Sequence, residues 1–203
     1  MRKILKNICT LVLLAAVLFL GVVFVDNNQL KEQLIRLHVV GESDSDYDQQ
    51  VKLQVRDAIT QRLNDVMVAI PDVETAKAYL QEHLPELEKI ANDALKAAGE
   101  TCTAVVTLAK EKFPTRDYDT FSLPAGVYES LRVTIGAGEG KNWWCVVFPQ
   151  LCVSATTEGF EDTAAGAGFS TSVTGAITGQ KNYQVRFFLM DCIGWVENWL
   201  FRG

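Results

Sequence analysis

The amino-terminal 25 residues constrain the fold of this chain more than any other segment. Three basic residues, Arg2, Lys3 and Lys6, precede an uncharged run of 18 residues that ends at Val25. A helix that spans a membrane needs roughly 17–25 apolar residues, so this run is long enough. A positively charged start followed by such a run is typical of an export signal or of a single membrane anchor. No small-x-small cleavage site precedes Asp26, which favours an anchor that is retained.

The rest of the chain is expected to face the outer side of the membrane, because the positive end stays inside. We expect residues 1–25 to be the signal or anchor segment, 26–33 a short polar stalk, and 34–203 a single extracytoplasmic domain. The first 25 residues hold three of the 19 basic residues and none of the 25 acidic ones, so the outward part has a net charge of −9. Such a surface disfavours nucleic acid and anionic lipid head groups as partners, and favours a protein or a small molecule.

Helices are predicted from apolar residues at helical spacing. After the acidic loop GESDSDYDQQ, a helix is expected from Asp46, capped by Ser45 or Asp46, with a buried face that comprises Val51, Val55, Ile59, Leu63, Val66 and Ile70. Pro71 ends this helix, and Asp72 begins a second one. Pro85 is expected to open a third helix that stops before Gly99, since proline is tolerated in the first turn of a helix but not in its interior.

Strands are predicted where apolar and polar residues alternate or where β-branched residues cluster. They are expected at 35–40, 103–108, 128–135, 142–148 and 185–189. The third and fourth should pair as an antiparallel hairpin across the turn GAGEGK. The segment 154–182, rich in Ala, Gly, Ser and Thr, is expected to be a mobile low-complexity insertion, followed after the last strand by a short amphipathic helix. This order of elements predicts an α+β fold, with helices packed on a mostly antiparallel sheet.

No motif in the sequence predicts a metal site, a cofactor site or a catalytic centre. The stretch DSDYD resembles the start of a calcium-binding loop, but Gln49 stands where that loop needs glycine and Val55 where it needs glutamate. The turn GAGEGK lacks the glycine spacing of a phosphate-binding loop. A thiol hydrolase that used Cys145 would need His38 or His83 as its base. We therefore expect a binding or signalling protein without a cofactor, rather than an enzyme.

Four cysteines lie outside the amino-terminal segment: Cys102, Cys145, Cys152 and Cys192. An even number of cysteines in an exported domain is typical of disulfide bonding, and four cysteines permit three pairings. We favour a bond between Cys145 and Cys152, because both lie in one compact apolar stretch, KNWWCVVFPQLCV. The alternative is that all four are buried free thiols.

Three segments together resemble the stage II sporulation protein R family of endospore-forming bacteria. They are IRLHVVGESDSDYDQQVKLQVRDAI, FPTRDYDTFSLPAGVYESLRVTIGAGEGKNWWCVVFPQLC and VRFFLMDCIGWVENWL. The resemblance covers roughly residues 33–152 and 185–200, and its most specific piece is the glycine-rich turn that runs into Trp143, Trp144 and Cys145. The tripeptide GES stands where the family pattern has ANS, and Cys102 and Cys192 are not part of that pattern.

The resemblance implies a signal rather than a catalyst. Members of this family are made in the forespore and exported into the space between the two membranes. There they trigger a membrane-embedded aspartic protease of the mother cell, which cleaves the inactive precursor of sigma-E. On this basis we expect an exported protein, secreted or anchored by its amino terminus, whose partner is that protease.

Trp143, Trp144, Asp44 and Asp46 are the candidate partner-binding residues. Side chains alternate between the two faces of a strand, so the two tryptophans cannot both point the same way. One is expected in the core and the other towards solvent or a partner, because tryptophan is enriched at binding hot spots. A purely structural role for both stays open. A competing hypothesis is a cell-envelope module that binds glycan or peptidoglycan by stacking one of these rings on sugars.

Overall fold

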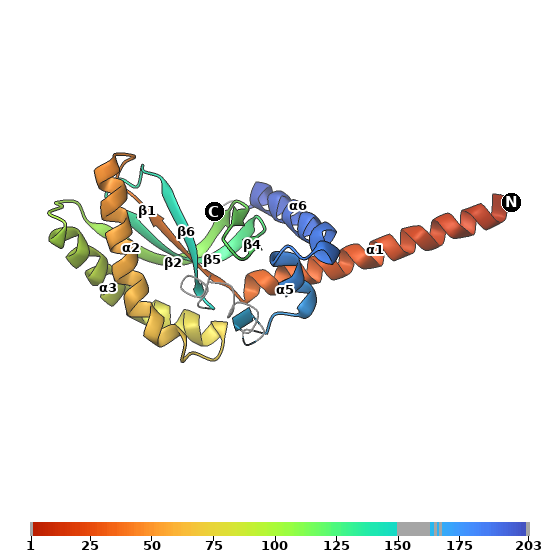
Figure 1. Cartoon of the computed structure of the whole chain (residues 1–203), viewed down its shortest axis with the longest axis horizontal. Helices are drawn as coiled ribbons and strands as arrows, with labels where there is room; N and C mark the ends of the chain where they lie inside the picture. Colours follow the sequence, from red (N-terminus) through yellow and green to blue (C-terminus); the bar gives the residue numbers. More distant parts are fainter. Residues whose placement is uncertain (1, 150–162, 165, 167, 202–203) are drawn as a thin grey trace.

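The computed structural model describes residues 2–149, 163, 164, 166 and 168–201, in which a long helix protrudes from one end of an α+β domain (Figure 1). The predicted α+β class is confirmed. A four-stranded sheet lies at the centre of the domain. Helices α2 and α3 pack on one of its faces, and the end of α1 packs with α5 and α6 near the other.

Helix α1 (Arg2–Glu32) joins the apolar segment to the domain without a break. By length and composition it can cross a membrane. Its residues are exposed as far as position 22, and from there on one side of the helix is buried. Val23 and Leu30 belong to the same hydrophobic cluster as residues of α5 and α6. Most of the segment expected to be a polar stalk, 26–33, is therefore helical and part of the domain.

Strand β1 (Ile35–Val40) is an inner strand of a sheet whose order is β2-β5-β1-β6. It pairs in parallel with β5 (Gly126–Ile135) and antiparallel with β6 (Asn142–Phe148), while β2 (Ala104–Phe113) pairs antiparallel with β5. The predicted β5–β6 hairpin is wrong, because β1 lies between these strands. All six residues of β1 are buried, and a strand buried on both faces takes an inner position in the sheet.

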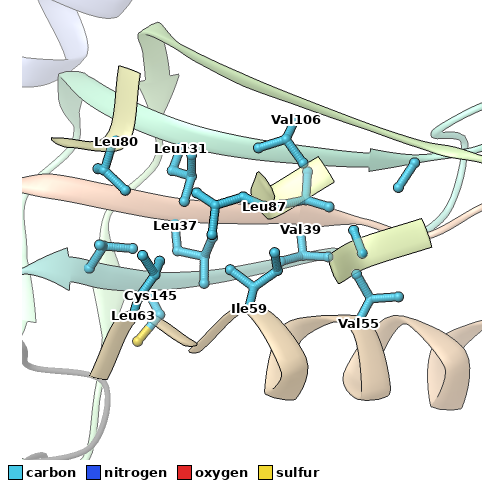
Figure 2. Packing of buried hydrophobic residues seen from close by; sticks show 14 of the residues in the cluster. Leu37, Val39, Val55, Ile59, Leu63, Leu80, Leu87, Val106, Leu131 and Cys145 are labelled. Carbon is cyan, nitrogen blue, oxygen red and sulfur yellow. The ribbon is translucent and has the colours of Figure 1, made fainter. Parts of the chain in front are cut away.

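Helices α2 (Asp46–Met67) and α3 (Val73–Ala97) begin where the sequence predicts. Ser45 caps α2 by accepting a hydrogen bond from the backbone N–H of Asp48 at 3.1 Å. The break predicted at Pro85 is wrong, since α3 continues through it. Buried leucines on both sides of Pro85 hold the two halves on one core, and this packing outweighs the cost of an interior proline. Figure 2 shows that core, formed by Leu37, Val39, Val55, Ile59, Leu63, Leu80, Leu87, Val106, Leu131 and Cys145.

The carboxyl-terminal part is helical where a strand and an insertion were expected. It comprises α5 (Thr171–Ile177), the short 3₁₀ helix η1 (Lys181–Tyr183) and α6 (Gln184–Leu200). The predicted strand at 185–189 is wrong, because a short apolar run has no periodicity that separates strand from helix. Residues 154–162, 165 and 167 of the expected insertion lie outside the described residues. In its later part, Val173, Ala176 and Ile177 are buried in the second hydrophobic cluster, so that part is packed on the domain.

Two further short strands, β3 (Arg116–Asp117) and β4 (Ser122–Leu123), pair with each other in the connector between β2 and β5. Tyr118 and Phe121 stack between them, with ring centroids 4.6 Å apart. Arg36 of β1, which is fully buried, donates a hydrogen bond to the Tyr118 hydroxyl at 2.6 Å. The connector is thereby tied to the sheet face that lies opposite α2 and α3.

Candidate partner-binding surface

The two adjacent tryptophans of β6 point to opposite faces of the sheet, as alternation predicts. Trp143 pairs in register with Val39 and packs against the core under α2, where the Arg56 guanidinium lies 4.8 Å from its ring centroid. Trp144 pairs in register with His38 and packs on the other face. Both side chains are half-buried, so neither is a freely exposed platform for a sugar ring.

Trp144 belongs to a polar and aromatic network that sequence reasoning missed. His38, only 3% exposed, stacks on the Trp144 ring with centroids 3.9 Å apart and planes 12° apart. Its Nδ1 lies 2.9 Å from Glu111 Oε1, and its Nε2 lies 2.7 Å from Asn142 Oδ1. The same Glu111 oxygen accepts a hydrogen bond from Arg132 at 2.6 Å. These residues come from four strands, so only the strand order could have revealed their proximity.

The neighbours of Glu111 stabilise the negative charge of its carboxyl group. Burial alone would raise the pKa of its carboxyl, but the hydrogen bond from His38 and the charges of His38 and Arg132 outweigh it and hold the pKa below its ordinary value. Glu111 is therefore an anion that orients the imidazole of His38. The stacked ring of Trp144 is in turn held at a fixed angle on the sheet.

The acidic loop after β1 is bonded to the glycine-rich turn, residues 136–141. Asp44 Oδ1 accepts a hydrogen bond from the backbone N–H of Lys141 at 2.7 Å. Glu42 Oε2 accepts one from Ala137 N–H at 2.7 Å, and Gly41 O accepts one from Gly140 N–H at 2.9 Å. Asp44 therefore has a structural role, whichever partner the loop meets.

Lys52 and Asp46 complete this region in different ways. The buried amine of Lys52 donates to Lys141 O at 2.8 Å and to Gln49 Oε1 at 2.6 Å, which ties α2 to the turn. Burial lowers the pKa of Lys52, against the opposing effect of the Asp44 charge.

Asp46 is exposed in the first turn of α2, where a negative charge suits the positive end of the helix. It is thus the predicted acidic residue that is free to meet a partner.

The aromatic network and the acidic loop are adjacent, because Asn142 bonds to His38 and its neighbour Lys141 bonds to Asp44. We call Trp144, Asn142, Lys141, Asp44 and Asp46 the tryptophan–loop surface. It combines an aromatic edge with exposed polar and acidic groups on a rigid backbone. Such a mixture fits recognition of a protein, in which a buried aromatic anchor is surrounded by a polar rim.

Cys145 lies on the face of the sheet opposite Trp144, 6% exposed and next to Leu63 of α2 (Figure 2). It is not one of the free cysteines, which are Cys9, Cys102 and Cys192 in the described part of the chain. Cys152 lies outside the described residues, so its bond to Cys145 stays a prediction.

Neither histidine is placed to act as a base for Cys145. His38 points to the other face of the sheet, as its register with Trp144 requires. His83 lies on α3, with its Nδ1 2.8 Å from Tyr79 O and its ring stacked on that of Tyr79. Within the described ranges there is also no group of three or more His, Cys, Asp or Glu side chains that could hold a metal ion. The positions of His38 and His83 argue against the thiol hydrolase hypothesis.

Comparison with known proteins gives a consistent result. A family model described as stage II sporulation protein R matches residues 31–158. A curated protein named stage II sporulation protein R, from Bacillus subtilis (strain 168), is 39% identical over 123 residues, which are 61% of this chain and 55% of that protein. The chain thus spans about half the length of that relative. No solved structure matches. The matched range contains β1, α2, β6 and the whole tryptophan–loop surface.

Proposed function

Because the chain belongs to the stage II sporulation protein R family, we propose that it is an exported signal that activates a membrane-embedded aspartic protease. That protease would then cleave the sigma-E precursor. The observation that carries the proposal is the family match over residues 31–158, which spans the sheet, the acidic loop and the glycine-rich turn. The activity and the partner of the whole protein are parts of this proposal.

The amino-terminal helix supports export. Helix α1 is apolar and long enough to be a signal or an anchor, and the basic residues before it favour an outward-facing domain. We place the domain in the space between the forespore and mother-cell membranes, secreted or held by α1. In that space it can reach a protease in the mother-cell membrane without crossing a bilayer.

The tryptophan–loop surface is the proposed contact with the protease. The ring of Trp144 is fixed by His38 and Glu111, so a partner would meet a preorganised aromatic edge at little entropic cost. Asp46 adds an exposed charge at the rim of the surface. We further propose that a disulfide between Cys145 and Cys152 fixes the end of β6, which carries this edge. Binding would shift the protease towards its active form, for example by stabilising an active dimer.

A reconstitution in a non-sporulating host tests the signalling role. The sigma-E precursor and the protease are expressed with and without this protein, and precursor cleavage is followed by immunoblotting. Cleavage that requires both this protein and its export is the expected result. A protein with a blocked export segment is the control. Absence of cleavage, with the protein shown to be folded and exported, contradicts the proposal, and a peptidoglycan pull-down then tests the glycan-binding hypothesis.

The contact surface is tested in the same host with charge-matched variants. Asp46→Asn removes one exposed carboxylate of the tryptophan–loop surface, and Glu82→Gln removes one from the exposed side of α3. We expect cleavage to fall at least several-fold with Asp46→Asn and to be unchanged with Glu82→Gln.

Trp143→Ala and Trp144→Ala are compared by both cleavage and unfolding. Full cleavage by a folded Trp144→Ala protein would remove this face from the proposal and leave the signalling role standing.

A further inference from the structure

The outward face of α6 is apolar along its whole length. Its exposed large residues are Val185, Phe188, Trp195, Val196, Trp199 and Leu200, and Trp199 is 83% exposed. With the exposed Cys192 between Phe188 and Trp195, they recur at helical spacing and form one stripe on one side of the helix. A helix on the surface of a soluble domain normally presents its polar side outwards. In α6 the arrangement is reversed.

The orientation of α6 is fixed by polar contacts on its inner side. Arg186 pairs with Asp26 of α1, and Glu197 pairs with Lys31 at 2.5 Å. Asp191 accepts hydrogen bonds from Ala125 N–H at 2.7 Å and from the Thr115 hydroxyl at 2.6 Å. A rotation that buried the apolar stripe would break these bonds and leave charges without partners, at a high cost in a partly buried site. The stripe is therefore kept facing outwards.

The stripe also continues the apolar surface of α1. The two helices, together with Lys110 of β2 and Val127 of β5, border an open groove of about 560 Å³. Its apolar lining includes Phe24 of α1 and Ile193, Val196 and Leu200 of α6. Arg186 lies near the Phe19 ring of α1, 5.7 Å from its centroid. Figure 1 shows α6 crossing α1 steeply at the end of the domain from which α1 protrudes. A bilayer that contained the exposed part of α1 would meet α6 at its surface.

The chemistry of the stripe fits a lipid surface better than a charged partner. The six exposed residues of the stripe carry no charge, while the part of the chain after residue 25 has a net charge of −9. The stripe itself therefore offers no charge to anionic head groups, and burial of its apolar area has to supply its binding energy. Tryptophan is enriched at the membrane–water boundary, because its ring is apolar and its N–H is polar. Trp195 and Trp199 both lie on this stripe.

We propose that α6 is an interfacial helix, which lies with its apolar stripe in the surface of the same bilayer that α1 enters. This contact is separate from the tryptophan–loop surface and does not rest on the signalling role. Two attachments, one spanning and one interfacial, would fix the angle of the domain to the membrane. The tryptophan–loop surface would then be presented in one orientation instead of rotating freely about α1.

Tryptophan quenching by lipid tests the proposal on the full chain. The chain has four tryptophans, Trp143, Trp144, Trp195 and Trp199, and none lies in α1. The protein is reconstituted into phosphatidylcholine vesicles that contain lipid brominated either near the head group or at the chain ends. Strong quenching, greater for bromine near the head group, is expected. The double variant Trp195→Phe/Trp199→Phe should lose most of it, since only the two sheet tryptophans remain.

Matched serine variants separate the stripe from exposed apolar residues in general. Phe188→Ser/Leu200→Ser alters residues that are 64% and 62% exposed on α6, and Val68→Ser/Val105→Ser alters residues that are 74% and 53% exposed on other elements. Only the first pair should reduce quenching and shift the tryptophan emission to the red. High salt should leave the quenching of the wild-type protein unchanged.

Three outcomes would overturn the proposal. Wild-type quenching no stronger than that of the Trp195→Phe/Trp199→Phe variant would place α6 away from lipid. Quenching that needs anionic lipid and disappears in salt would replace apolar insertion by an electrostatic contact. Absence of quenching, together with blue emission that is lost as the protein is diluted in the bilayer, would assign the stripe to a second copy of the chain.

Discussion

At the scale of single residues, the His38 network shows how one charge can set the geometry of an aromatic surface. Glu111 receives hydrogen bonds from His38 and Arg132 on the face where His38 supports the ring of Trp144. The carboxylate is mostly covered, with 19% of its side chain exposed. Hydrogen bonds to a covered charge contribute more to stability than neutral ones, about 1.5–3 kcal/mol. Glu111 should therefore matter for stability and for the position of Trp144.

Glu111→Gln should lower the free energy of unfolding by about 1.5 kcal/mol at pH 7, because the charge is lost but the shape is kept. The folded-state pKa of Glu111 is lowered, so its contribution is complete above the unfolded value of about 4.3 and is lost as the pH falls through the folded value. The wild type and the variant should therefore converge in acid. Urea unfolding in detergent micelles at several pH values measures this. A difference independent of pH would contradict it, and Glu82→Gln, on an exposed residue, is the control.

Gly140 is a residue at which the fold leaves no room for a side chain. A Cβ atom there would overlap the Ser43 carbonyl oxygen and lie 2.9 Å from Gly41 O. Both are backbone atoms, so the turn and the acidic loop would have to separate. Gly140→Ala is expected to cost about 1–3 kcal/mol of stability. Gly166→Ala adds a methyl group that meets nothing within 4 Å in the described part of the chain, and it should cost little. Equal thermal stability of the two variants would show that the loop and the turn are not packed so closely.

At the scale of elements, local patterns predicted what each segment becomes better than what it pairs with. The caps of α2 and α3 are local signals and are confirmed, and Val51, Val55, Ile59 and Leu63 of the predicted face of α2 are buried, whereas Val66 is half-buried and Ile70 lies beyond the end of the helix. The hairpin is not confirmed, because nothing in β5 or β6 says that β1 will lie between them. The predicted helix break at Pro85 and the predicted strand at 185–189 were wrong for a related reason. In both places packing on a distant part of the chain outweighs local preference.

The same limit applies to the candidate site. Trp143 and Trp144 could be assigned to opposite faces from alternation alone. The partners of Trp144 could not be predicted, since Glu111 and Arg132 reach it only through the order of the strands. The reversed polarity of α6 was hidden as well. The sequence predicts an amphipathic helix but not which of its sides faces inwards, and the ion pairs to α1 determine that side.

The position of α6 depends on Gly194, and this gives a prediction at the same scale. A Cβ atom at Gly194 would overlap the carbonyl group of Ala125, just before β5. Gly194→Ala should therefore lift α6 from the sheet and weaken the hydrogen bond from Ala125 N–H to Asp191. We expect a loss of about 1–3 kcal/mol and faster amide exchange along α6, with α2 and α3 unaffected. Hydrogen-exchange mass spectrometry checks this, and slow exchange in α6 of the variant would refute it.

At the scale of the whole molecule, α1 divides into a part that serves the membrane and a part that serves the fold. Residues 2–22 are exposed, whereas Val23, Asn27 and Leu30 are fully buried. Asp26 and Lys31 also provide the ion-pair partners of Arg186 and Glu197 on α6. The last third of α1 is thus a structural helix of the domain. If α1 is a signal that is removed, the position of the cut decides whether the domain keeps the helical residues that it needs for folding.

Deletion of residues 2–22 should leave the second hydrophobic cluster intact and change the melting temperature by only a few degrees. Deletion of residues 2–31 should remove Val23 and Leu30 from that cluster and leave Arg186 and Glu197 unpaired. Removing a buried partner of an ion pair costs about 3–5 kcal/mol, and each lost large apolar side chain costs about 2–5 kcal/mol. In the longer deletion, these two kinds of loss together amount to much of the stability of an ordinary domain. Circular dichroism melts of the two proteins measure the difference. If both melted alike, the end of α1 would be a mere linker. If only the longer deletion unfolded, a cut before Val23 would release a folded signal, whereas a cut after Leu30 would destroy it.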